Sequence, residues 1–196
     1  IPDWGLQIIV VDDGSCDATG EKIVSWVREA PDRGGVQMVR HSNNRGKGAA
    51  IRSGLGHATG NAVLIQDADL EYDPADIPRL LDAYGEGVDA VFGSRNLAPT
   101  GKGYWHFVAG VKALTMFTNL LFHAHLTDVY TGYKLVRTEQ LRACNLICDG
   151  FDIEAEITAK LLKRGAIIVE VPIHYFPRAF REGKKIRVRD GVVGAW

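Results

Sequence analysis

Short, continuous apolar runs alternate with stretches of helical periodicity along most of this chain. The apolar runs predict strands at residues 6–11, 36–40, 62–66, 90–93 and 167–171. The periodic stretches predict helices at residues 19–29, 47–58, 74–84, 105–123 and 153–163. Strands that are apolar throughout and separated by helices are typical of a mostly parallel sheet covered on both faces. The pattern therefore predicts an α/β fold.

Length and charge narrow the class further. The 196 residues, of which 46% are hydrophobic, fit one globular domain spanning residues 1–196. The net charge of −1 gives no overall attraction to nucleic acid, so we expect no nucleic-acid partner. Cys16, Cys144 and Cys148 lack the spacing of a zinc site. We expect them to be reduced, mostly buried thiols, which favours a cytoplasmic location.

The most apolar long stretch, residues 105–122, is interrupted by polar residues that fall mostly on one helical face. This pattern indicates an amphipathic helix rather than a membrane span. Such a helix suits a membrane interface, and it equally suits packing against the domain's own sheet.

Acidic residues follow two of the predicted strands. Asp12 and Asp13 end the run IIVVDD, and Asp67 and Asp69 end the run VLIQDAD. Ligands of parallel α/β sheets bind beyond the carboxyl ends of the strands. Residues two apart on an extended chain point the same way, so Asp67 and Asp69 can face one point. Both pairs are also typical of turns and helix caps, and that alternative stays open.

The pair at 67 and 69 has the chemistry of a metal site. Mg²⁺ and Mn²⁺ prefer carboxylate oxygens, take one or two of them from protein, and complete their shell with phosphate and water. The pair therefore predicts a divalent ion that holds a diphosphate. A helix that opens at Gly46-Lys47-Gly48 could bind an anion at its N-terminus, although a solvated basic turn has the same sequence signature.

Four segments taken in order, VVDDGSCD, NNRGKGAAIRSG, IQDADLEYDP and GSR, resemble the inverting family 2 glycosyltransferases of GT-A fold. Residues 126–137, 150–165 and 170–186 are similar to the branch that transfers sugars to dolichyl or polyprenyl phosphate. The likeness covers nearly the whole chain. One departure is the family's first strand, with a Pro-x-Tyr-Asn-Glu-like motif that helps to bind the nucleotide base. It is absent here, and we expect that the N-terminal strand and the extreme C-terminus are missing.

The resemblance, together with the chemistry at the strand ends, implies a donor site. Asp12 and Asp13 would contact the nucleoside, and Asp67 and Asp69 would hold the metal, with Glu71 as a helper. Residues 128–134 would line the sugar pocket. The predicted nucleotide-sugar-binding residues are Asp12, Asp13, Lys47, Asp67, Arg95 and Lys134.

The acceptor side is predicted from charge. The segment from Arg178 to Arg189 contains six Lys or Arg residues and a single acid. Such a cluster suits a phosphate, either the donor's diphosphate or the head group of a lipid-linked acceptor. A solvated edge strand guarded by charge is the alternative. The predicted phosphate-binding residues are Arg178, Arg181, Lys184 and Lys185.

A hydroxyl acceptor would require a general base. The candidates are Asp128, Asp152, Glu154 and Glu156. Asp152 and Glu156 share a helical face, whereas Glu154 points elsewhere. A phosphate acceptor is already ionised and needs little help from a base. The histidines are scattered and receive no catalytic role.

These features predict a metal-dependent inverting glycosyltransferase that uses Mg²⁺ or Mn²⁺. It would move a hexose from a nucleotide sugar of the GDP-mannose or UDP-glucose type to a polyprenyl or dolichyl phosphate, in the cytoplasm at the inner face of a membrane. A family 2 enzyme with a soluble sugar or small-molecule acceptor is one alternative. A sugar-nucleotidyltransferase is another, and a non-catalytic nucleotide-sugar binding module is a third.

Overall fold

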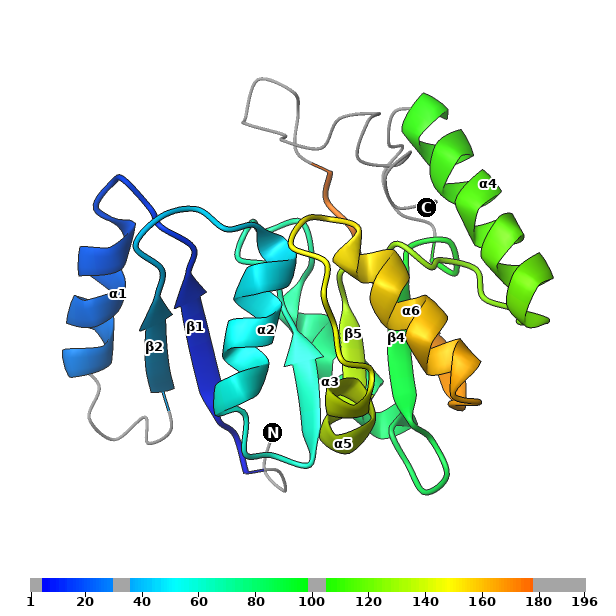
Figure 1. Ribbon diagram of the computed structural model, residues 1–196, viewed down its shortest axis with the longest axis horizontal. Coiled ribbons are helices and arrows are strands. Elements are labelled where there is room, and N and C mark those ends of the chain that lie inside the picture. Colours follow the sequence, from blue (N-terminus) through cyan, green and yellow to red (C-terminus); the bar gives the residue numbers. More distant parts are fainter. Residues whose placement is uncertain (1–4, 30–35, 99–104, 178–196) are drawn as a thin grey trace.

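The computed structural model describes residues 5–29, 36–98 and 105–177 (Figure 1). The first part of the chain forms β1 (Ile8–Asp12), α1 (Thr19–Arg28), β2 (Val36–Arg40) and α2 (Lys47–His57). The middle forms β3 (Ala62–Ile65), the 3₁₀ turn η1 (Pro74–Asp76), α3 (Ile77–Ala83), β4 (Ala90–Ser94) and α4 (Trp105–Phe122). The last part forms β5 (Lys134–Arg137), α5 (Thr138–Ala143), α6 (Ile153–Lys163) and β6 (Ile168–Pro172).

The strands form two sheets. β1 and β2 pair in parallel, with Asp12 opposite Arg40. The larger sheet has the order β3-β5-β4-β6, in which β4 and β6 are parallel and β5 is antiparallel to both of its neighbours. Figure 1 shows β1, β2 and β3 pointing the same way. Most carboxyl ends therefore lie along one edge, and the predicted mostly parallel α/β arrangement is confirmed.

Every strand and helix predicted above is present, with small differences at the ends. The predicted helix at residues 74–84 is divided into η1 and α3, because the second proline of the segment, Pro78, begins a new helical turn. Two elements, β5 and α5, were not predicted. β5 begins with Lys134 and ends with Arg137, so no apolar run marks it, and α5 is a helix of only six residues.

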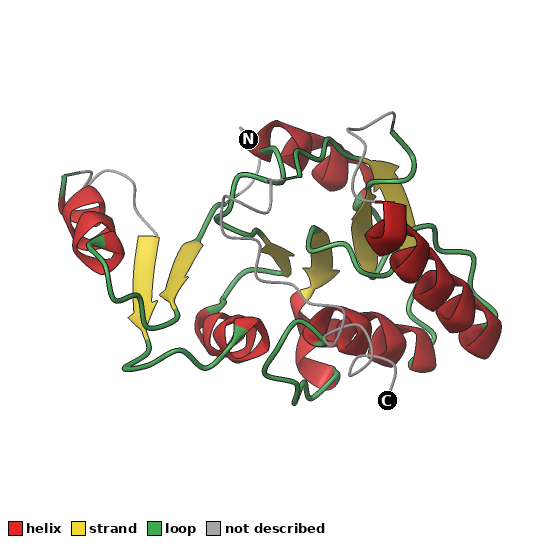
Figure 2. Ribbon diagram, turned by 90° about the horizontal axis from the view of Figure 1, so that it is seen from above, coloured by secondary structure: helices red, strands yellow, loops and turns green. Residues whose placement is uncertain are grey.

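Apolar side chains alternate between the two faces of the larger sheet, as strand geometry requires. On one face, Phe92 and Val136 are fully buried against α5 and α6, with Ile157 among the residues of that core. On the other face, Val91 of β4 and Leu80 of α3 are both fully buried in a second core. Figure 2 shows helices on both sides of the sheets. This packing holds the strand ends, and the loops that follow them, in place.

Helix α4 packs against α6, and Asn119 ties its end to the core through hydrogen bonds with the backbone of Leu126 (2.7 and 3.0 Å). An apolar group on its outer side stays exposed: Met116, Phe117, Leu120 and Leu121. The structure thus has both a packed side and an exposed apolar side on this helix. Within the described ranges, no helix combines the length and apolarity needed to span a bilayer.

Candidate active site

A chain of alternating charges leads from the end of β3 into the protein interior. The Lys47 ammonium, at the start of α2, lies 2.7 Å from Asp67 Oδ2 and 2.7 Å from Glu154 Oε1. Glu154, on α6, places its second oxygen 2.5 Å from Lys134 Nζ. Lys134 is fully buried and also donates to the carbonyl of Thr131. The positive charge that the acidic run after β3 requires is therefore supplied in this structure by Lys47.

The pKa values of these groups follow from burial and charge. Burial raises the pKa of the Asp67 carboxyl, and the nearby Lys47 opposes this rise only in part. Burial alone would raise the pKa of Glu154 as well, but the ammonium groups of Lys134 and Lys47 bring it below the ordinary value. Burial would lower the pKa of Lys47, yet Glu154 and Asp67 raise it overall. Lys47 and Glu154 are therefore both charged near neutral pH.

The acidic residues after Asp67 lie in a turn rather than on an extended strand. β3 ends at Ile65, and Leu70 has a φ of +63°. Asp69 Oδ1 accepts a hydrogen bond from the backbone of Glu71 (3.0 Å), and Asp73 caps η1 through Ala75 N (2.9 Å). The strand geometry invoked above to align Asp67 with Asp69 is therefore not the geometry that places them. The two carboxylates nevertheless lie close enough for Asp69 to raise the pKa of Asp67.

The donor set at this turn fits a hard divalent cation. In the part of the chain that the structure describes, no three His, Cys, Asp or Glu side chains gather as a ready-made metal cage. Mg²⁺ commonly takes only one or two carboxylates from protein and shares the phosphates of a substrate. Asp67 and Asp69 could supply that number of oxygens.

Aromatic side chains hold residues 128–134 against the turn. The Tyr72 ring stacks on Tyr133 with centroids 5.4 Å apart, and its hydroxyl accepts a hydrogen bond from Gly132 N (3.1 Å). A Cβ on Gly132 would lie 2.7 Å from Asp67 Oδ2 and 3.0 Å from Lys47 Nζ. Glycine therefore allows the backbone to approach the ion pair, which places the predicted sugar-pocket segment beside Asp67.

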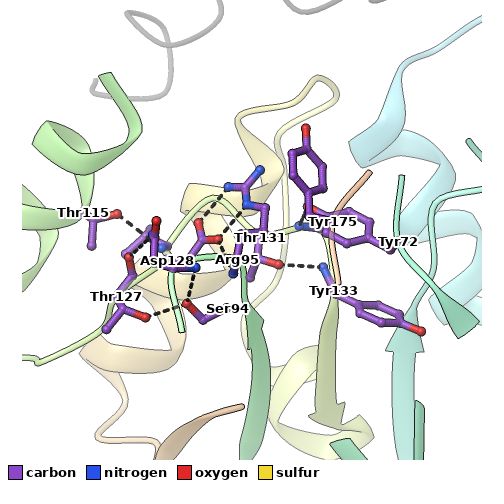
Figure 3. Close-up of polar contacts among 12 residues, drawn as sticks. Tyr72, Ser94, Arg95, Thr115, Thr127, Asp128, Thr131, Tyr133 and Tyr175 are labelled. Atoms are coloured by element: carbon purple, nitrogen blue, oxygen red, sulfur yellow. Dashed lines mark hydrogen bonds and ion pairs between the residues drawn. The ribbon is translucent and has the colours of Figure 1, made fainter. Parts of the chain in front are cut away.

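Arg95, directly after β4, is held by a buried carboxylate (Figure 3). Its Nε and Nη2 donate to the two oxygens of Asp128, each at 2.7 Å, and Asp128 is fully buried. Glu170 in turn accepts hydrogen bonds from the backbone of Thr127 and Asp128 (2.7 and 2.9 Å). The Arg95 guanidinium also lies over the Tyr175 ring, 5.2 Å from its centroid. This bidentate geometry fixes the orientation of the guanidinium.

The two acids after β1 organise the neighbouring loops. Asp13 accepts hydrogen bonds from Arg45 N and Gly46 N (2.9 and 2.8 Å) and lies 2.7 Å from His41 Nδ1. Asp12 Oδ1 accepts from Ser15 N (2.9 Å). The Ser15 side chain, this backbone contact and the Arg40 guanidinium together hold the pKa of Asp12 below its ordinary value, although burial opposes them. Both acids therefore have the turn-forming contacts that the sequence left open as the alternative to ligand binding.

The loops that follow β1 and β2 line an open hollow, and the fully buried Asp12 side chain is not part of its lining. Asp12 Oδ2 is buried, lies 3.2 Å from Arg40 Nε, and accepts no hydrogen bond from the described residues. The adjacent hollow has a volume of about 450 Å³. It is lined by Gly14, Ser15, Cys16, Arg40, His41 and Ser42.

Several amide groups at the start of α2 are already bound within the protein. Gly48 N and Ala49 N donate to the carbonyl of Asp149 (2.7 and 3.4 Å). Gly46 has a φ of +99°, and a Cβ on Gly48 would lie 2.1 Å from the carbonyl oxygen of Cys148. These glycines allow the helix start to pack directly on residues 148–149, which positions Lys47.

The candidate base residues of α6 differ in their surroundings. Glu156 accepts hydrogen bonds from Ile147 N and Cys148 N (both 2.9 Å) and pairs with Lys160 at 2.6 Å. Asp152 is half-buried and, within the described residues, forms no ion pair. Burial, with hydrogen bonds to Asp152 and Glu156, raises the pKa of the Cys148 thiol to about 12.

The remaining predictions have mixed outcomes. Cys144 is buried and Cys148 partly buried, but Cys16 is exposed because it lies in the loop after β1, so the expectation of mostly buried thiols fails there. The predicted phosphate-binding residues Arg178, Arg181, Lys184 and Lys185 lie outside the described residues.

Several residues at this edge were not singled out from the sequence. His41 directly follows β2, and the rule that ligands lie after strand ends would have found it; its second nitrogen lies 2.9 Å from Ser53 Oγ. Tyr72 stands inside the acidic run, where its ring was a visible signal. Glu170 and Tyr175 follow no such pattern, because only the folded chain brings them to Asp128 and Arg95.

Comparison with known proteins agrees with this geometry. Residues 5–143 match Glycosyl transferase family 2. The chain is 30% identical over 203 residues to the polyprenol monophosphomannose synthase of Mycolicibacterium smegmatis, covering 97% of this chain and 76% of that protein. It is 32% identical over 198 residues to the undecaprenyl-phosphate mannosyltransferase of Micrococcus luteus, covering 96% and 78%. It is 30% identical to the dolichol-phosphate mannosyltransferase of Pyrococcus furiosus, covering 91% and 50%.

Solved structures show the same fold. Glucosyl-3-phosphoglycerate synthase from Mycobacterium tuberculosis in complex with UDP aligns with a TM-score of 0.65 at 19% identity, over 93% of this chain and 62% of that one. The complex of that enzyme with Mn²⁺, UDP and phosphoglyceric acid aligns with a TM-score of 0.65 at 20% identity, over 90% and 62%. The chain thus spans about six tenths of the structures it matches. From its sequence match and its fold, the chain belongs to family 2 of the glycosyltransferases, with the GT-A fold.

Proposed function

We propose that this glycosyltransferase moves a hexose, with inversion, from a nucleotide sugar to a polyprenyl phosphate, and that the transfer depends on a divalent metal. The observation that carries the proposal is the convergence of Asp67, Lys47 and Gly132 at the end of β3. An acidic pair, a cation and a close backbone approach are the parts that a metal-bound diphosphate and its sugar require. The relatives named as polyprenol- and undecaprenyl-phosphate mannosyltransferases support this substrate class, with mannose as the sugar.

The donor would bind along the edge from β1 to β3. The nucleoside would occupy the hollow lined by Ser15, Arg40 and Ser42, and Asp12 would hold that wall in place through its contacts with Ser15 and Arg40. The diphosphate would lie at Asp67 and Asp69, which would hold Mg²⁺ or Mn²⁺. When bound, the ion would stabilise the charge of the departing diphosphate. Lys47 would contribute positive charge at the same point.

The state of the candidate bases favours a phosphate as the nucleophile. Asp128 has both oxygens bound to Arg95, while cationic and N–H partners hold the pKa values of Glu154 and Glu156 below their ordinary values. A carboxylate with a lowered pKa is a weak general base. A phosphate acceptor is already ionised, so an edge with few competent bases suits it better than a hydroxyl acceptor.

The soluble-acceptor alternative has one observation in its favour. The aligned synthase was crystallised with phosphoglyceric acid, a small molecule that carries a hydroxyl. Transfer to a hydroxyl would need a base, and Asp152 is the candidate whose carboxylate has no ion pair within the described residues. A hydroxyl acceptor would therefore need Asp152 as a general base, whereas a phosphate acceptor would not.

The lipid acceptor would require contact with a membrane. The exposed apolar side of α4, with Met116, Phe117, Leu120 and Leu121, would lie on the cytoplasmic face of the bilayer as a peripheral contact. The basic segment that begins at Arg178 would meet the phosphate head group.

A transfer assay tests these proposals. The full chain is incubated with radiolabelled GDP-mannose or UDP-glucose, with and without Mn²⁺, and with either undecaprenyl phosphate or 3-phosphoglycerate. We expect label in the organic phase with one donor, only when metal is present, and with the anomeric configuration inverted. Asp152→Asn should leave this transfer within about threefold of the wild type, since a phosphate needs little base assistance. Label on the water-soluble acceptor, with a large loss in Asp152→Asn, would support the soluble alternative. Donor binding without any transfer would support a binding module.

A further inference from the structure

The Lys47 ammonium lies between two carboxylates that differ in their exposure to solvent. Asp67 stands at the open end of the charge chain, with 28% of its side chain exposed, whereas the Glu154 side chain is 5% exposed. On the third side, the backbone of Gly132 approaches so closely that a Cβ there would lie 3.0 Å from Lys47 Nζ. The ammonium is therefore held in place from within the protein, while its outer partner faces the site.

Glu154 is itself held rigidly by Lys134. The second oxygen of Glu154 lies 2.5 Å from Lys134 Nζ, which also donates to Thr131 and lies 5.0 Å from the centroid of the Phe92 ring. Moving this buried carboxylate away from its two ammonium partners would cost free energy, because it would leave uncompensated charges in the protein interior. Glu154 is therefore an anchor for Lys47 rather than a group that moves during the reaction.

We propose that Lys47, anchored by Glu154 and Lys134, is the counter-ion that Asp67 exchanges for a divalent metal, and that this exchange couples metal binding to diphosphate binding. The proposal rests on the proposed function, since it assumes that Asp67 binds a metal next to a diphosphate. It assigns Glu154 the role of a positioning residue, which acts through Lys47, instead of the role of a base.

The coupling follows from charge. Asp67, Lys47, Glu154 and Lys134 together carry no net charge when all are ionised, so only Asp69 adds a negative charge to attract a cation. A dication at Asp67 would place two further positive charges beside an ammonium that Glu154 prevents from leaving, which opposes binding of the metal alone. A diphosphate brings negative charge to both the metal and Lys47. Each ligand should therefore strengthen the binding of the other by the same factor.

The test is a pair of binding titrations on the full chain. Mn²⁺ affinity is measured by electron paramagnetic resonance without nucleotide, and UDP and GDP affinities are measured by calorimetry without metal. In Lys47→Met we expect Mn²⁺ alone to bind about fivefold or more tightly than in the wild type, and the nucleoside diphosphate alone to bind more weakly by a similar factor. Loss of one stabilising contact would not produce changes of opposite sign.

Two further variants complete the experiment. Lys163→Met removes the same charge from an exposed position near the end of α6, and both affinities should stay at the wild-type values. Glu154→Gln with Lys134→Met keeps the charge balance of the interior while it removes the anchor. In that double variant nothing but Asp67 holds Lys47, so the ammonium can move away from an incoming cation. Mn²⁺ alone should therefore bind more tightly than in the wild type, at an unchanged circular dichroism spectrum, and an unchanged or lower affinity would show that Glu154 does not anchor Lys47.

The outcomes separate the two proposals. If wild-type protein binds Mn²⁺ with UDP or GDP, but Lys47→Met leaves the affinity for Mn²⁺ alone equal or lower, the counter-ion exchange is wrong and the metal-dependent function stands. If wild-type protein binds no Mn²⁺ with or without either nucleotide, both are wrong. If the double variant does not fold, the Lys47→Met and Lys163→Met titrations decide the matter alone.

Discussion

At the scale of single residues, most acids at the candidate site are bound by the protein's own cations and N–H groups. Asp128 is paired with Arg95, Glu154 with Lys47 and Lys134, and Glu156 with Lys160. A buried carboxylate that lost such a partner would cost several kcal/mol, on the order of 3–5. These ion pairs therefore hold the site in its shape. Only the side chains at its open end can bind a ligand without breaking such a pair.

Glu156 should make the stability of the protein depend on acid. Burial would raise its pKa, but Lys160 and the backbone N–H groups of Ile147 and Cys148 lower it below the ordinary value of 4.5. A carboxylate with a lowered folded-state pKa stabilises the fold above its unfolded pKa and loses this contribution as pH falls through the folded value. Glu156→Gln should therefore reduce the free energy of unfolding more at pH 7 than at pH 4. Denaturant titrations at both pH values check this, and an equal reduction at both would contradict it.

At the scale of elements, close contact between α2 and residues 148–149 positions Lys47. Gly48→Ala should disturb this contact, because its Cβ would lie 2.1 Å from the carbonyl oxygen of Cys148. We expect a loss of about 1–3 kcal/mol in unfolding free energy, typical of overpacking, together with weaker UDP or GDP binding. Gly56→Ala is the matched control on the same helix, since nothing lies within 4 Å of its Cβ. It should stabilise the protein by roughly 0.5–1 kcal/mol. Equal effects of the two substitutions would show that the contact does not matter.

The elements also show how far a sequence can be interpreted alone. Apolar runs and helical periods are local, and among the described elements they predicted every strand except β5 and every helix except α5. β5 was missed because its buried Lys134 belongs to an ion pair with Glu154, so a charge stands where a strand pattern expects an apolar residue. The acidic site at Asp67 was predicted, but it lies in a turn rather than on an extended strand, and Lys47 was not predicted as the partner of Asp67. Lys47 and Glu154 reach it from other helices, and no spacing in the sequence encodes that meeting.

At the scale of the whole molecule, the apolar side of α4 is separate from the strand edge that binds the donor in our proposal. Figure 1 shows α4 at the end of the molecule away from β1 and β2. Met116 and Leu120, one helical turn apart, are 71% and 73% exposed. Contiguous exposed apolar surface of this kind is typical of contact surfaces. If the acceptor is held in a bilayer, the membrane would therefore contact the α4 end of the molecule.

This arrangement predicts that membrane binding and donor binding can be separated by mutation. Met116→Ser with Leu120→Ser should lower the fraction of protein that sediments with phosphatidylglycerol vesicles by about tenfold, because two fully buried apolar side chains contribute roughly 1.5–3 kcal/mol each and partial insertion contributes less. The thermal midpoint and the affinity for UDP or GDP should not change, since neither side chain packs in the core. Leu6→Ser removes a 63% exposed apolar side chain next to β1, and it should leave sedimentation unchanged. Vesicle binding that persists in the double variant would assign membrane contact to another surface, and equal losses in Leu6→Ser would reduce it to general hydrophobic adsorption.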